Sequence, residues 1–310
     1  MKKIKVVIFG GAGFVGNSIV KLIDKKKYEV VVFDNLSTGF VSNLEDIDEF
    51  EFVTGDIRKE CDVDNVLNEA EIVYHLAALT SVEESFYKSE LYYENNVYGT
   101  HNIVRGMLKN KVRKIIYSSS SAVYGEVLAN GYDENFLPNP NNIYGLTKLD
   151  GEYIIKIYAI NEGLEYTILR YQNVYGPKQS FDSDYCSVIP LFINNALNEK
   201  VLKIYGDGEQ RRDFVYVEDI ANANILSMNS GANETFNVAT GELLSINYLA
   251  EKIKQIVNKK IKIEHYPPRK GDDLGSVVDT SRIKDELKWS PQTTFEQGLL
   301  KTYNYYAGKN

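Results

Sequence analysis

The chain has 310 residues, 44% of them hydrophobic and 25% charged, which is ordinary for a globular protein with one main domain and a smaller one. Its formal net charge of −8 argues against nucleic acid or a membrane surface as a partner, because both need a basic face. No stretch reaches the ~18 consecutive apolar residues of a membrane helix. The two cysteines and three histidines are too scattered to predict a disulfide framework or a metal site.

The first residues, MKKIKVVIFGG, briefly resemble a signal peptide. The apolar run VVIF is shorter than the core of about 7–15 residues that a signal peptide needs, and glycines follow it. We therefore interpret the run as a first buried strand and expect a cytoplasmic protein.

Short apolar runs alternate with longer amphipathic stretches up to about residue 170. The runs are rich in β-branched and aromatic residues, as is typical of strands buried on both faces: 6–9, 30–33, 50–53, 72–76, 114–118 and 166–170. The stretches between them predict helices over 14–26, 62–69, about 86–109 and about 142–162. Strands that alternate with helices predict an α/β fold of Rossmann type, with a doubly wound parallel sheet.

The pattern changes after about residue 171. A long loop precedes a short helix around 187–198, and residues 204–220 predict a strand, a turn and a second strand that leads into a helix. DFVYVED and FNVAT look like returns to the main sheet, so we expect a smaller, interleaved α/β domain. The first domain would hold residues 1–172 and about 213–240. The second would hold about 173–212 and 241–310.

Glycines follow the first predicted strand directly and open the first predicted helix, at Gly10, Gly13 and Gly16. This spacing allows a tight turn, brings backbone amides up to a pyrophosphate and places the anion at the helix N-terminus. Asp34 ends the second predicted strand, where a carboxylate can accept both ribose hydroxyls of an adenosine and would repel a 2′-phosphate. The alternative is a structural glycine turn, but this combination favours a binding site for NAD over one for NADP.

Tyr144 and Lys148 are four residues apart, so on a helix they share a face. An ammonium near a phenol lowers its pKa from about 10 toward working pH, which makes the phenol a usable base. Pairs at 248 and 252 and at 266 and 270 have the same spacing, but the first lies on a tail helix and the second spans two prolines. The Tyr144 pair opens a long helix soon after a sheet strand and is therefore the catalytic candidate.

Four serines, 118–121, stand at the carboxyl end of the strand predicted at 114–118, which the first of them ends. Ligands bind at the carboxyl edge of an open α/β sheet, and a hydroxyl there can bond a substrate oxygen and help to pass a proton. A solvated linker fits poorly, because Ile115, Ile116 and Tyr117 lead straight into the serines.

With these motifs, the chain resembles the extended short-chain dehydrogenase/reductase family and, within it, the UDP-glucose 4-epimerase group of nucleotide-sugar enzymes. The matches run in order nearly from end to end: GGAGFVG, DNLSTG (34–39), GDIR (55–58), YHLAA (74–78), NVYGT (96–100), SSSSAVYG (118–125), YGLTK (144–148), RYQNVYGP (170–177), YGDGEQRRDFVYVED (205–219) and RKGDDLGSVVDTSRIKDELKWSP (269–291). The resemblance implies NAD as the cofactor and a UDP-sugar as the substrate.

The resemblance assigns the cofactor to the glycine turn, the loops after the second and third strands, the segment after the fourth strand and four later positions. The implied NAD-binding residues are Gly10, Gly13, Phe14, Val15, Gly16, Asp34, Asn35, Ser37, Thr38, Gly39, Asp56, Ile57, Leu76, Ala77, Ala78, Asn96, Tyr144, Lys148 and Tyr171.

The family pattern also implies which serine is catalytic. The serine just before an alanine-type position carries the reaction, and counting back from Tyr124 and Gly125 assigns Ser120. Ser121 then stands where the family usually has alanine, which leaves Ser119 and Ser121 as rival candidates.

On the substrate side, the resemblance implies that Asn173, Arg212 and Arg269 bind the diphosphate, since the planar fork of arginine suits phosphate. Surface salt bridges are the alternative role for the two arginines. The implied substrate-binding residues are Ser81, Ser120, Asn173, Val188, Lys203, Tyr205, Arg212, Arg269 and Ser276.

Ser276 stands where the family varies a gate residue beside the sugar. A bulky residue restricts the pocket to plain hexoses, whereas serine leaves room for a 2-acetamido group. We therefore expect UDP-glucose and UDP-galactose, and also their N-acetylated counterparts, as substrates.

The expected reaction is NAD-dependent epimerisation at C4 of a UDP-hexose through a transient 4-keto intermediate, with Tyr144 as base. A 4,6-dehydratase would need an acid pair just after the catalytic hydroxyl, where Ser121 and Ala122 stand. A UDP-glucuronate 4-epimerase or decarboxylase remains an alternative. A non-catalytic NAD-sensing protein would have no reason to keep Ser120, Tyr144 and Lys148 together.

Members of the family commonly dimerise through two long helices packed as a four-helix bundle, here about 86–109 and 142–162. We expect a homodimer of this kind. The apolar residues that permit it are Ile103, Val104, Met107, Ile154 and Ile157, although these side chains could instead face the sheet.

Overall fold

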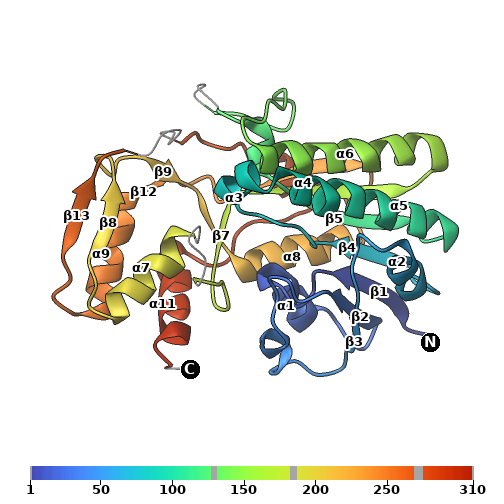
Figure 1. Cartoon of the computed structure of the whole chain (residues 1–310), viewed down its shortest axis with the longest axis horizontal. Coiled ribbons are helices and arrows are strands. Elements are labelled where there is room, and N and C mark those ends of the chain that lie inside the picture. Colours follow the sequence, from blue (N-terminus) through green and yellow to red (C-terminus); the bar gives the residue numbers. More distant parts are fainter. Residues whose placement is uncertain (1, 127–130, 182–186, 269–274, 309–310) are drawn as a thin grey trace.

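A seven-stranded parallel sheet forms the larger part of the molecule in this computed structural model, which describes residues 2–126, 131–181, 187–268 and 275–308 (Figure 1). The spatial order of the strands is β11-β6-β5-β4-β1-β2-β3, and every neighbouring pair is parallel. The strands are β1 Ile4–Phe9, β2 Tyr28–Asp34, β3 Glu51–Thr54, β4 Ile72–His75, β5 Lys114–Ser120, β6 Glu165–Tyr171 and β11 Glu234–Val238. The predicted α/β fold of Rossmann type is confirmed.

Helices cover both faces of this sheet, which explains why its strands read as unbroken apolar runs. Val6 and Ile8 pack on one face with residues of α1 (Phe14–Leu22) and α8 (Val217–Ser227). Val7 and Phe9 pack on the other face with α2 (Glu60–Val66), α5 (Gly99–Lys109) and α6 (Ile143–Glu162). Successive side chains of a strand point to opposite faces, so both sets must be apolar.

Two returns to the sheet were predicted, and one of them is wrong. FNVAT supplies β11, which pairs with β6 as expected. DFVYVED instead supplies β10 (Phe214–Tyr216), which pairs with β7 (Asn173–Tyr175) in a separate two-stranded sheet. The edge of the main sheet beyond β6 is already occupied by β11, which leaves no place there for β10.

The long helix predicted over 86–109 is broken into several pieces. They are α3 (Val82–Tyr87), α4 (Ser89–Tyr92), a π-helical segment (Tyr93–Tyr98) and α5. Lys88 has a backbone conformation outside the helical region, at φ −124° and ψ 39°, which ends α3. A π-helical segment inside a helical run is frequent at functional sites, and this one contains Asn96.

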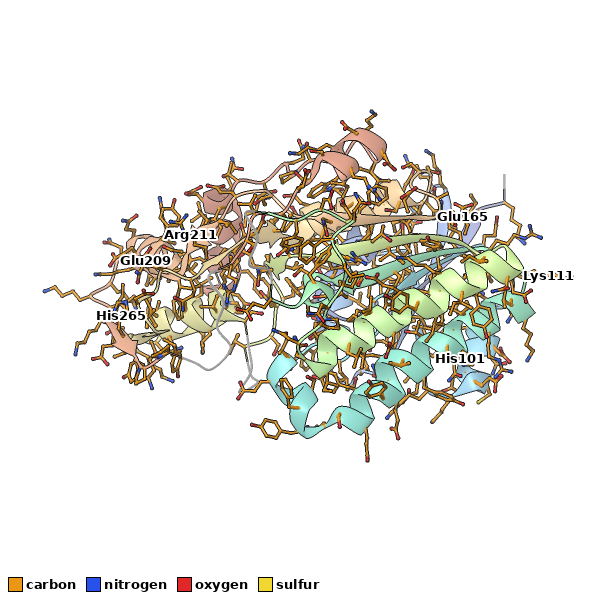
Figure 2. All side chains as sticks on the ribbon, turned by 90° about the horizontal axis from the view of Figure 1, so that it is seen from above. His101, Lys111, Glu165, Glu209, Arg211 and His265 are labelled. Carbon is orange, nitrogen blue, oxygen red and sulfur yellow. The ribbon has the colours of Figure 1, made fainter. Side chains whose placement is uncertain are left out.

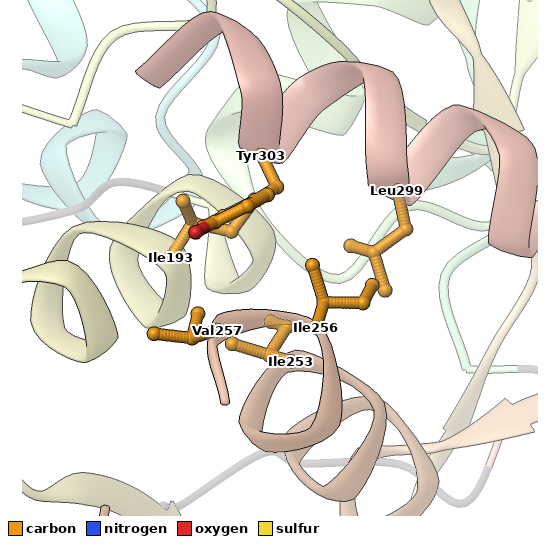
Figure 3. A pocket seen from close by; sticks show the side chains of 6 residues that line it. All are labelled: Ile193, Ile253, Ile256, Val257, Leu299 and Tyr303. Carbon is orange, nitrogen blue, oxygen red and sulfur yellow. The ribbon is translucent and has the colours of Figure 1, made fainter. Parts of the chain in front are cut away.

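The remaining elements form a second core. Helices α7 (Val188–Leu197), α9 (Ile246–Val257) and α11 (Phe295–Tyr306) pack together with two short parallel strands, β8 (Leu202–Tyr205) and β13 (Ile263–Tyr266). Ile193, Ile253 and Leu299 meet between the three helices and leave no room for a water molecule (Figure 3). An antiparallel pair, β9 (Arg211–Arg212) and β12 (Leu244–Ser245), completes this part.

A segment near the C-terminus returns to the first core. Ile283 of α10 (Ser281–Glu286), Leu287 and Trp289 pack with the residues of β11 and α8. We propose the two-domain division expected from the sequence, with residues 281–289 joined to the first domain.

Two kinds of feature are missing from the part of the chain that the structure describes. No helix in it is long and apolar enough to cross a membrane. It also contains no group of three or more His, Cys, Asp and Glu residues placed to hold a metal ion.

Candidate active site

Six strands, β1 to β6, bring predicted site residues to the carboxyl edge of the main sheet. Strand β1 lies between β4 and β2, and such a switch point leaves a crevice for ligands outside the carboxyl ends of the strands. The glycine turn follows β1, Leu76–Ala78 follow β4, and Asp34 ends β2. Ser120 and Tyr171 end β5 and β6, so the expected cofactor and catalytic groups converge on one edge.

The glycine turn is packed so closely that side chains would not fit. A Cβ on Gly10, whose φ is +82°, would lie 2.6 Å from the backbone nitrogen of Ala77, and one on Gly16 would collide with the carbonyl oxygen of Gly10. Gly13 begins α1 without a capping side chain, and Phe14 and Val15 follow it in the first turn. The free amides and the close backbone approach fit a pyrophosphate, the group through which a dinucleotide is held.

Asp34 is buried beside this turn. Its carboxylate accepts hydrogen bonds from the backbone N–H groups of Ala12 (3.0 Å) and Leu36 (2.8 Å). Burial raises its pKa, and these hydrogen bonds oppose the rise. Gly39 packs against Ala12, so the loop that holds Asn35 and the exposed residues Ser37 and Thr38 folds over the glycine turn.

The loop after β3 contributes one polar group to this side. The Asp56 carboxylate binds the guanidinium of Arg58, which lowers the pKa of that carboxyl to about 2, and it accepts a 3.5 Å hydrogen bond from the Asn35 amide. Ile57, by contrast, is buried in the core against Gly99.

Asn96 ties the segment after β4 to α6, the helix that carries Tyr144 and Lys148. Its side-chain oxygen accepts the Leu79 N–H at 2.8 Å, and its amide donates to the Leu79 carbonyl and, at 3.1 Å, to the Thr147 hydroxyl. Thr147 directly precedes Lys148. Ser81 lies in the same region and caps α3 by accepting the Glu84 N–H.

Ser120 and Tyr144 are side by side at the end of β5. Ser120 caps a short 3₁₀ helix (Ser121–Tyr124), and its hydroxyl accepts the Ala122 N–H at 3.1 Å. Tyr144 lies in the first turn of α6, where burial raises the pKa of its phenol and the Ser120 hydroxyl lowers it. Asn142 starts this helix by accepting the Gly145 N–H at 2.8 Å.

The first three of the four serines have different partners. The Ser118 hydroxyl shares a 2.8 Å hydrogen bond with Tyr171, whose phenol also bonds Asn224 in the core. The Ser119 hydroxyl donates to Glu152 at 2.6 Å. Strand β5 runs to Ser120, so the prediction that Ser118 ends it is wrong, because residues 118–120 continue the pairing with β6.

Lys148 is almost fully buried, with its ammonium 4.4 Å from the centre of the Tyr117 ring. Burial lowers its pKa to about 7, and the Glu152 carboxylate opposes that change. The group that favours the ionised form of Tyr144 is the Ser120 hydroxyl. The Lys148 ammonium lies over the Tyr117 ring, and an effect of Lys148 on the pKa of Tyr144 stays a prediction.

The predicted substrate residues lie on several short elements. Asn173 is in β7 and donates to the Asp213 carbonyl at 3.2 Å, whereas Arg212 is in β9. Lys203 and Tyr205 lie on β8, where the Tyr205 ring centre is 6.0 Å from that of Tyr266. Val188 begins α7. Arg269 lies outside the described residues.

Ser276 connects the two parts of the molecule through its neighbours. Gly275 packs against the carbonyl oxygen of Arg211, where a Cβ would not fit. The carbonyl of Val277 accepts the Tyr132 N–H at 3.1 Å, and the Tyr132 ring lies 4.6 Å from that of Tyr124. Ser276 is thereby held between β9 and the turn that follows Ser120.

Two buried residues of this region were missed by sequence reasoning. Glu152 is completely buried one helical turn beyond Lys148, and Arg170 of β6 binds its carboxylate through two nitrogens at 2.9 and 2.6 Å. The four-residue spacing that singled out Tyr144 and Lys148 continues to Glu152, so the signal was present.

The parallel sheet, the glycine cradle and the tyrosine–lysine helix turn define a dinucleotide-binding protein of the extended short-chain dehydrogenase/reductase type. A family model described as "NAD dependent epimerase/dehydratase family" matches residues 6–239. The chain belongs to this family, whose cofactor is NAD.

Similar proteins match along nearly the whole chain. UDP-glucose 4-epimerase of Mycolicibacterium smegmatis is 33% identical over 99% of both chains. UDP-N-acetylglucosamine 4-epimerase of Methanobrevibacter ruminantium, solved with UDP-N-acetylmuramic acid, is 37% identical over 100% of both chains, with a TM-score of 0.94. UDP-glucose 4-epimerase of Thermotoga maritima, solved with UDP-glucose, is 35% identical over 98% of this chain and 99% of its own, also with a TM-score of 0.94. Decarboxylases and dehydratases of nucleotide sugars match as well.

Proposed function

We propose that this protein is a UDP-hexose 4-epimerase that interconverts the C4 epimers of a UDP-sugar with NAD as its cofactor. The observation that carries the proposal is the contact between Ser120 and Tyr144 at the carboxyl edge of the sheet, with Lys148 one helical turn further on. Relatives with 4-epimerase activity toward UDP-sugars, similar over nearly the whole chain, support the same reaction.

NAD fits the residues at this edge, because the glycine cradle accepts a backbone approach that a Cβ would block. When bound, NAD supplies a nicotinamide ring that accepts a hydride from the sugar C4 and returns it. The amides at the start of α1 hold the pyrophosphate and Asp34 holds the adenosine ribose. The other proposed contacts come from Asn35–Gly39, Asp56, Ile57, Leu76–Ala78, Asn96 and Tyr171.

Tyr144 moves the proton. As a phenolate it takes the proton of the sugar 4-hydroxyl while the C4–H bond breaks, and it gives the same proton back when that bond reforms on the opposite face. Ser120 bonds both the sugar oxygen and the phenol, which keeps the proton path short. Lys148, when charged, stabilises the phenolate and binds the nicotinamide ribose.

The predicted substrate residues hold the nucleotide while the 4-keto sugar rotates to present its other face. Arg212, Arg269 and Asn173 bind the diphosphate, since guanidinium groups match phosphate oxygens in pairs. Lys203 and Tyr205 flank the uracil, with Ser81 and Val188 nearer the sugar and the nucleotide. A nucleotide sugar held only by its diphosphate can present either face of C4 to the same catalytic groups.

The small side chain of Ser276 supports a pocket with room for a 2-acetamido group. We propose that UDP-glucose, UDP-galactose and their N-acetylated counterparts are all substrates. The Methanobrevibacter relative, which bears the name of an N-acetylated sugar, supports this range. Ser121 and Ala122 follow Ser120 where a 4,6-dehydratase needs an acid pair, so dehydration is disfavoured.

We also propose a homodimer. It forms through the run of helices from α3 to α5 and through α6, which lie on the same face of the sheet (Figure 1). Ile103, Val104 and Met107 are buried against the sheet, which is the alternative left open for them. Ile160, however, is 83% exposed, and other large apolar side chains of the same helices are exposed too: Phe86, Tyr87, Tyr93, Tyr98, Tyr153 and Ile157. A surface of this kind is typical of an interface between copies.

The test is direct. The purified protein is incubated separately with UDP-glucose, UDP-N-acetylglucosamine and UDP-glucuronate, and NMR detects the C4 epimer of each. We expect epimers of the first two. Turnover of UDP-glucuronate alone, or release of carbon dioxide, would replace the proposal with a uronate epimerase or decarboxylase. NAD binding without turnover of any UDP-sugar would contradict it altogether.

A further inference from the structure

A buried ion pair lies directly behind the catalytic groups. On α6, Tyr144, Lys148 and Glu152 follow one another at four-residue intervals and so share one helix face. The Glu152 carboxylate is completely buried and accepts hydrogen bonds from Ser119 at 2.6 Å and from two nitrogens of Arg170 at 2.9 and 2.6 Å. The helix face that carries the proposed base therefore ends in a fully bonded charge.

The hydrogen-bond partners of Glu152 belong to two adjacent strands, and Lys156, one turn further along α6, lies 3.8 Å from the carboxylate. Ser119 of β5 and Arg170 of β6 are opposite one another in the sheet register, and Ser119 directly precedes Ser120. The remaining guanidinium nitrogen of Arg170 donates to the Tyr124 hydroxyl at 2.8 Å, at the end of the 3₁₀ turn that Ser120 caps. One ion pair thus joins the helix, both strands and the turn that together hold the catalytic residues.

Such a pair is weak evidence for stability, because the cost of burying two charges offsets most of their attraction. Its position suggests another role. We propose that Glu152 is a positioning residue: clamped by Arg170 and Ser119, it holds the Tyr144–Lys148 face of α6 against the end of β5 and keeps Lys148 charged. This inference rests on the proposed function, since that function assigns the catalytic roles.

The groups around Lys148 leave the Glu152 carboxylate as the main influence that raises the pKa of Lys148. From β4, His75 is kept neutral, because burial and the Lys148 ammonium lower its pKa well below its usual value. From β5, burial raises the pKa of the Tyr117 phenol well above its usual value, and from α6, burial raises that of Tyr144 while the Ser120 hydroxyl lowers it. Glu152 is the charged group that raises the pKa of Lys148, which stands at about 7. Without that carboxylate the pKa falls further, and Lys148 loses its proton at neutral pH.

The main experiment is Glu152→Gln in the NAD-bound enzyme, with kcat and KM for the UDP-sugar measured across pH. Protonated Lys148 is the active form, so activity falls on the basic side as Lys148 deprotonates. We expect that basic limb of kcat to move about one pH unit lower, with kcat reduced and KM unchanged, because Glu152 touches no substrate. Titration of the Lys148 side-chain nitrogen by ¹⁵N NMR should move in the same direction.

Two variants serve as controls. Glu165→Gln makes the same chemical change at the amino end of the same strands, where Glu165 accepts a 2.5 Å hydrogen bond from Lys114, far from Arg211 and the small sheets (Figure 2). It should move neither the basic limb nor the Lys148 titration. Glu152→Asp keeps the charge and should keep a pH profile close to the wild type even where its melting temperature is lower.

The outcomes are distinguishable. A Glu152→Gln enzyme with a lower melting temperature but an unchanged basic limb and unchanged Lys148 titration would overturn the proposal, since a purely structural role predicts that result. If Glu152→Gln does not fold, Ser119→Ala tests the clamp with the ion pair intact. We expect it to lower kcat about tenfold with KM unchanged, and an unaltered kcat overturns the proposal. A wild type that turns over no UDP-sugar refutes the proposed function, while the NMR titration still decides the role of Glu152.

Discussion

The carboxyl edge of the main sheet and the short strands of the smaller part hold their polar residues in different ways. On the main sheet, Asp34, Asn96 and Lys148 are buried and fixed by neighbours on several elements. On the smaller part, Asn173 is exposed and Arg212 half-buried, on strands of three and two residues. In the proposed reaction, the groups of the main-sheet edge transfer the proton and therefore need a closely held geometry, whereas those of the smaller part bind the nucleotide sugar.

From this difference we expect the two regions to control different kinetic parameters. A change at the main-sheet edge should lower kcat and leave KM near its original value, because it alters contacts made during the reaction. A change on the smaller part should raise KM or alter the choice of sugar, because it alters binding of the substrate in every state. The experiments that follow test this separation. A change in KM from the main-sheet edge, or a change in kcat from the smaller part, would contradict it.

The largest effect is expected for Tyr144→Phe. Removal of the phenol removes the proton acceptor, and general-base catalysis contributes about 10²- to 10⁴-fold, so kcat for UDP-galactose should fall by about that factor. Binding of NAD and of UDP should stay nearly unchanged, as measured by calorimetry. Tyr248→Phe is the matched control, since Tyr248 opens the other helical tyrosine–lysine pair, on α9, and should leave kcat unaltered. A mild effect of Tyr144→Phe would remove this residue from the mechanism.

How far the sequence predicted this edge depends on the kind of contact. The glycine turn, Asp34 and the spacing of Tyr144 and Lys148 are local patterns, each a few residues long, whose strand and helix context could be read directly. The placement of the Lys148 ammonium over Tyr117 could not, because it depends on how α6 packs across β5. A four-residue spacing gives the shared helix face but not the neighbour that the face meets.

Long-range pairing explains one error and one alternative that the sequence left open. DFVYVED has the apolar pattern of a sheet strand, but β11 occupies the edge where it would have paired. The apolar residues of α5, such as Ile103 and Met107, suited either a dimer interface or a place against the sheet, and the sheet buries them. Both cases have one cause: an apolar face shows that something covers it, and only the assembled fold shows what.

The second largest effect is expected for Arg212→Ala. Loss of a charge-assisted contact to a diphosphate costs about 10- to 150-fold in binding, so KM for the UDP-sugar should rise by that factor with kcat little changed. Arg211→Ala removes the same charge from the neighbouring, exposed position and should change KM little. Steady-state kinetics of both variants give the answer. A fall in kcat with constant KM would place Arg212 with the catalytic groups instead.

Ser276→Tyr tests the choice of sugar. A phenol at this position fills the space left for the 2-acetamido group, so kcat/KM for UDP-N-acetylgalactosamine should fall about tenfold or more, and that for UDP-galactose should hold. Ser276→Ala keeps the space open and is the control. Competition between the two sugars in one reaction measures the ratio directly. Wild type that rejects the N-acetylated sugar, or equal losses for both sugars, would contradict the assignment of Ser276 as a gate.

The smallest effect is expected for Arg58→Gln, which concerns stability on the cofactor side. The Arg58 guanidinium lowers the pKa of Asp56 from 3.8 to about 2, so the ion pair stabilises the folded state above the pKa of the unfolded chain and loses that contribution as the pH falls toward 2. Because Arg58 is partly exposed, its loss should cost only about 0.5–1 kcal/mol at pH 7. Urea unfolding of wild type and variant at pH 7 and at pH 3 measures the difference, which should shrink at the lower pH. A difference of equal size at both values would mean that the Arg58 side chain stabilises the loop by packing rather than by its charge.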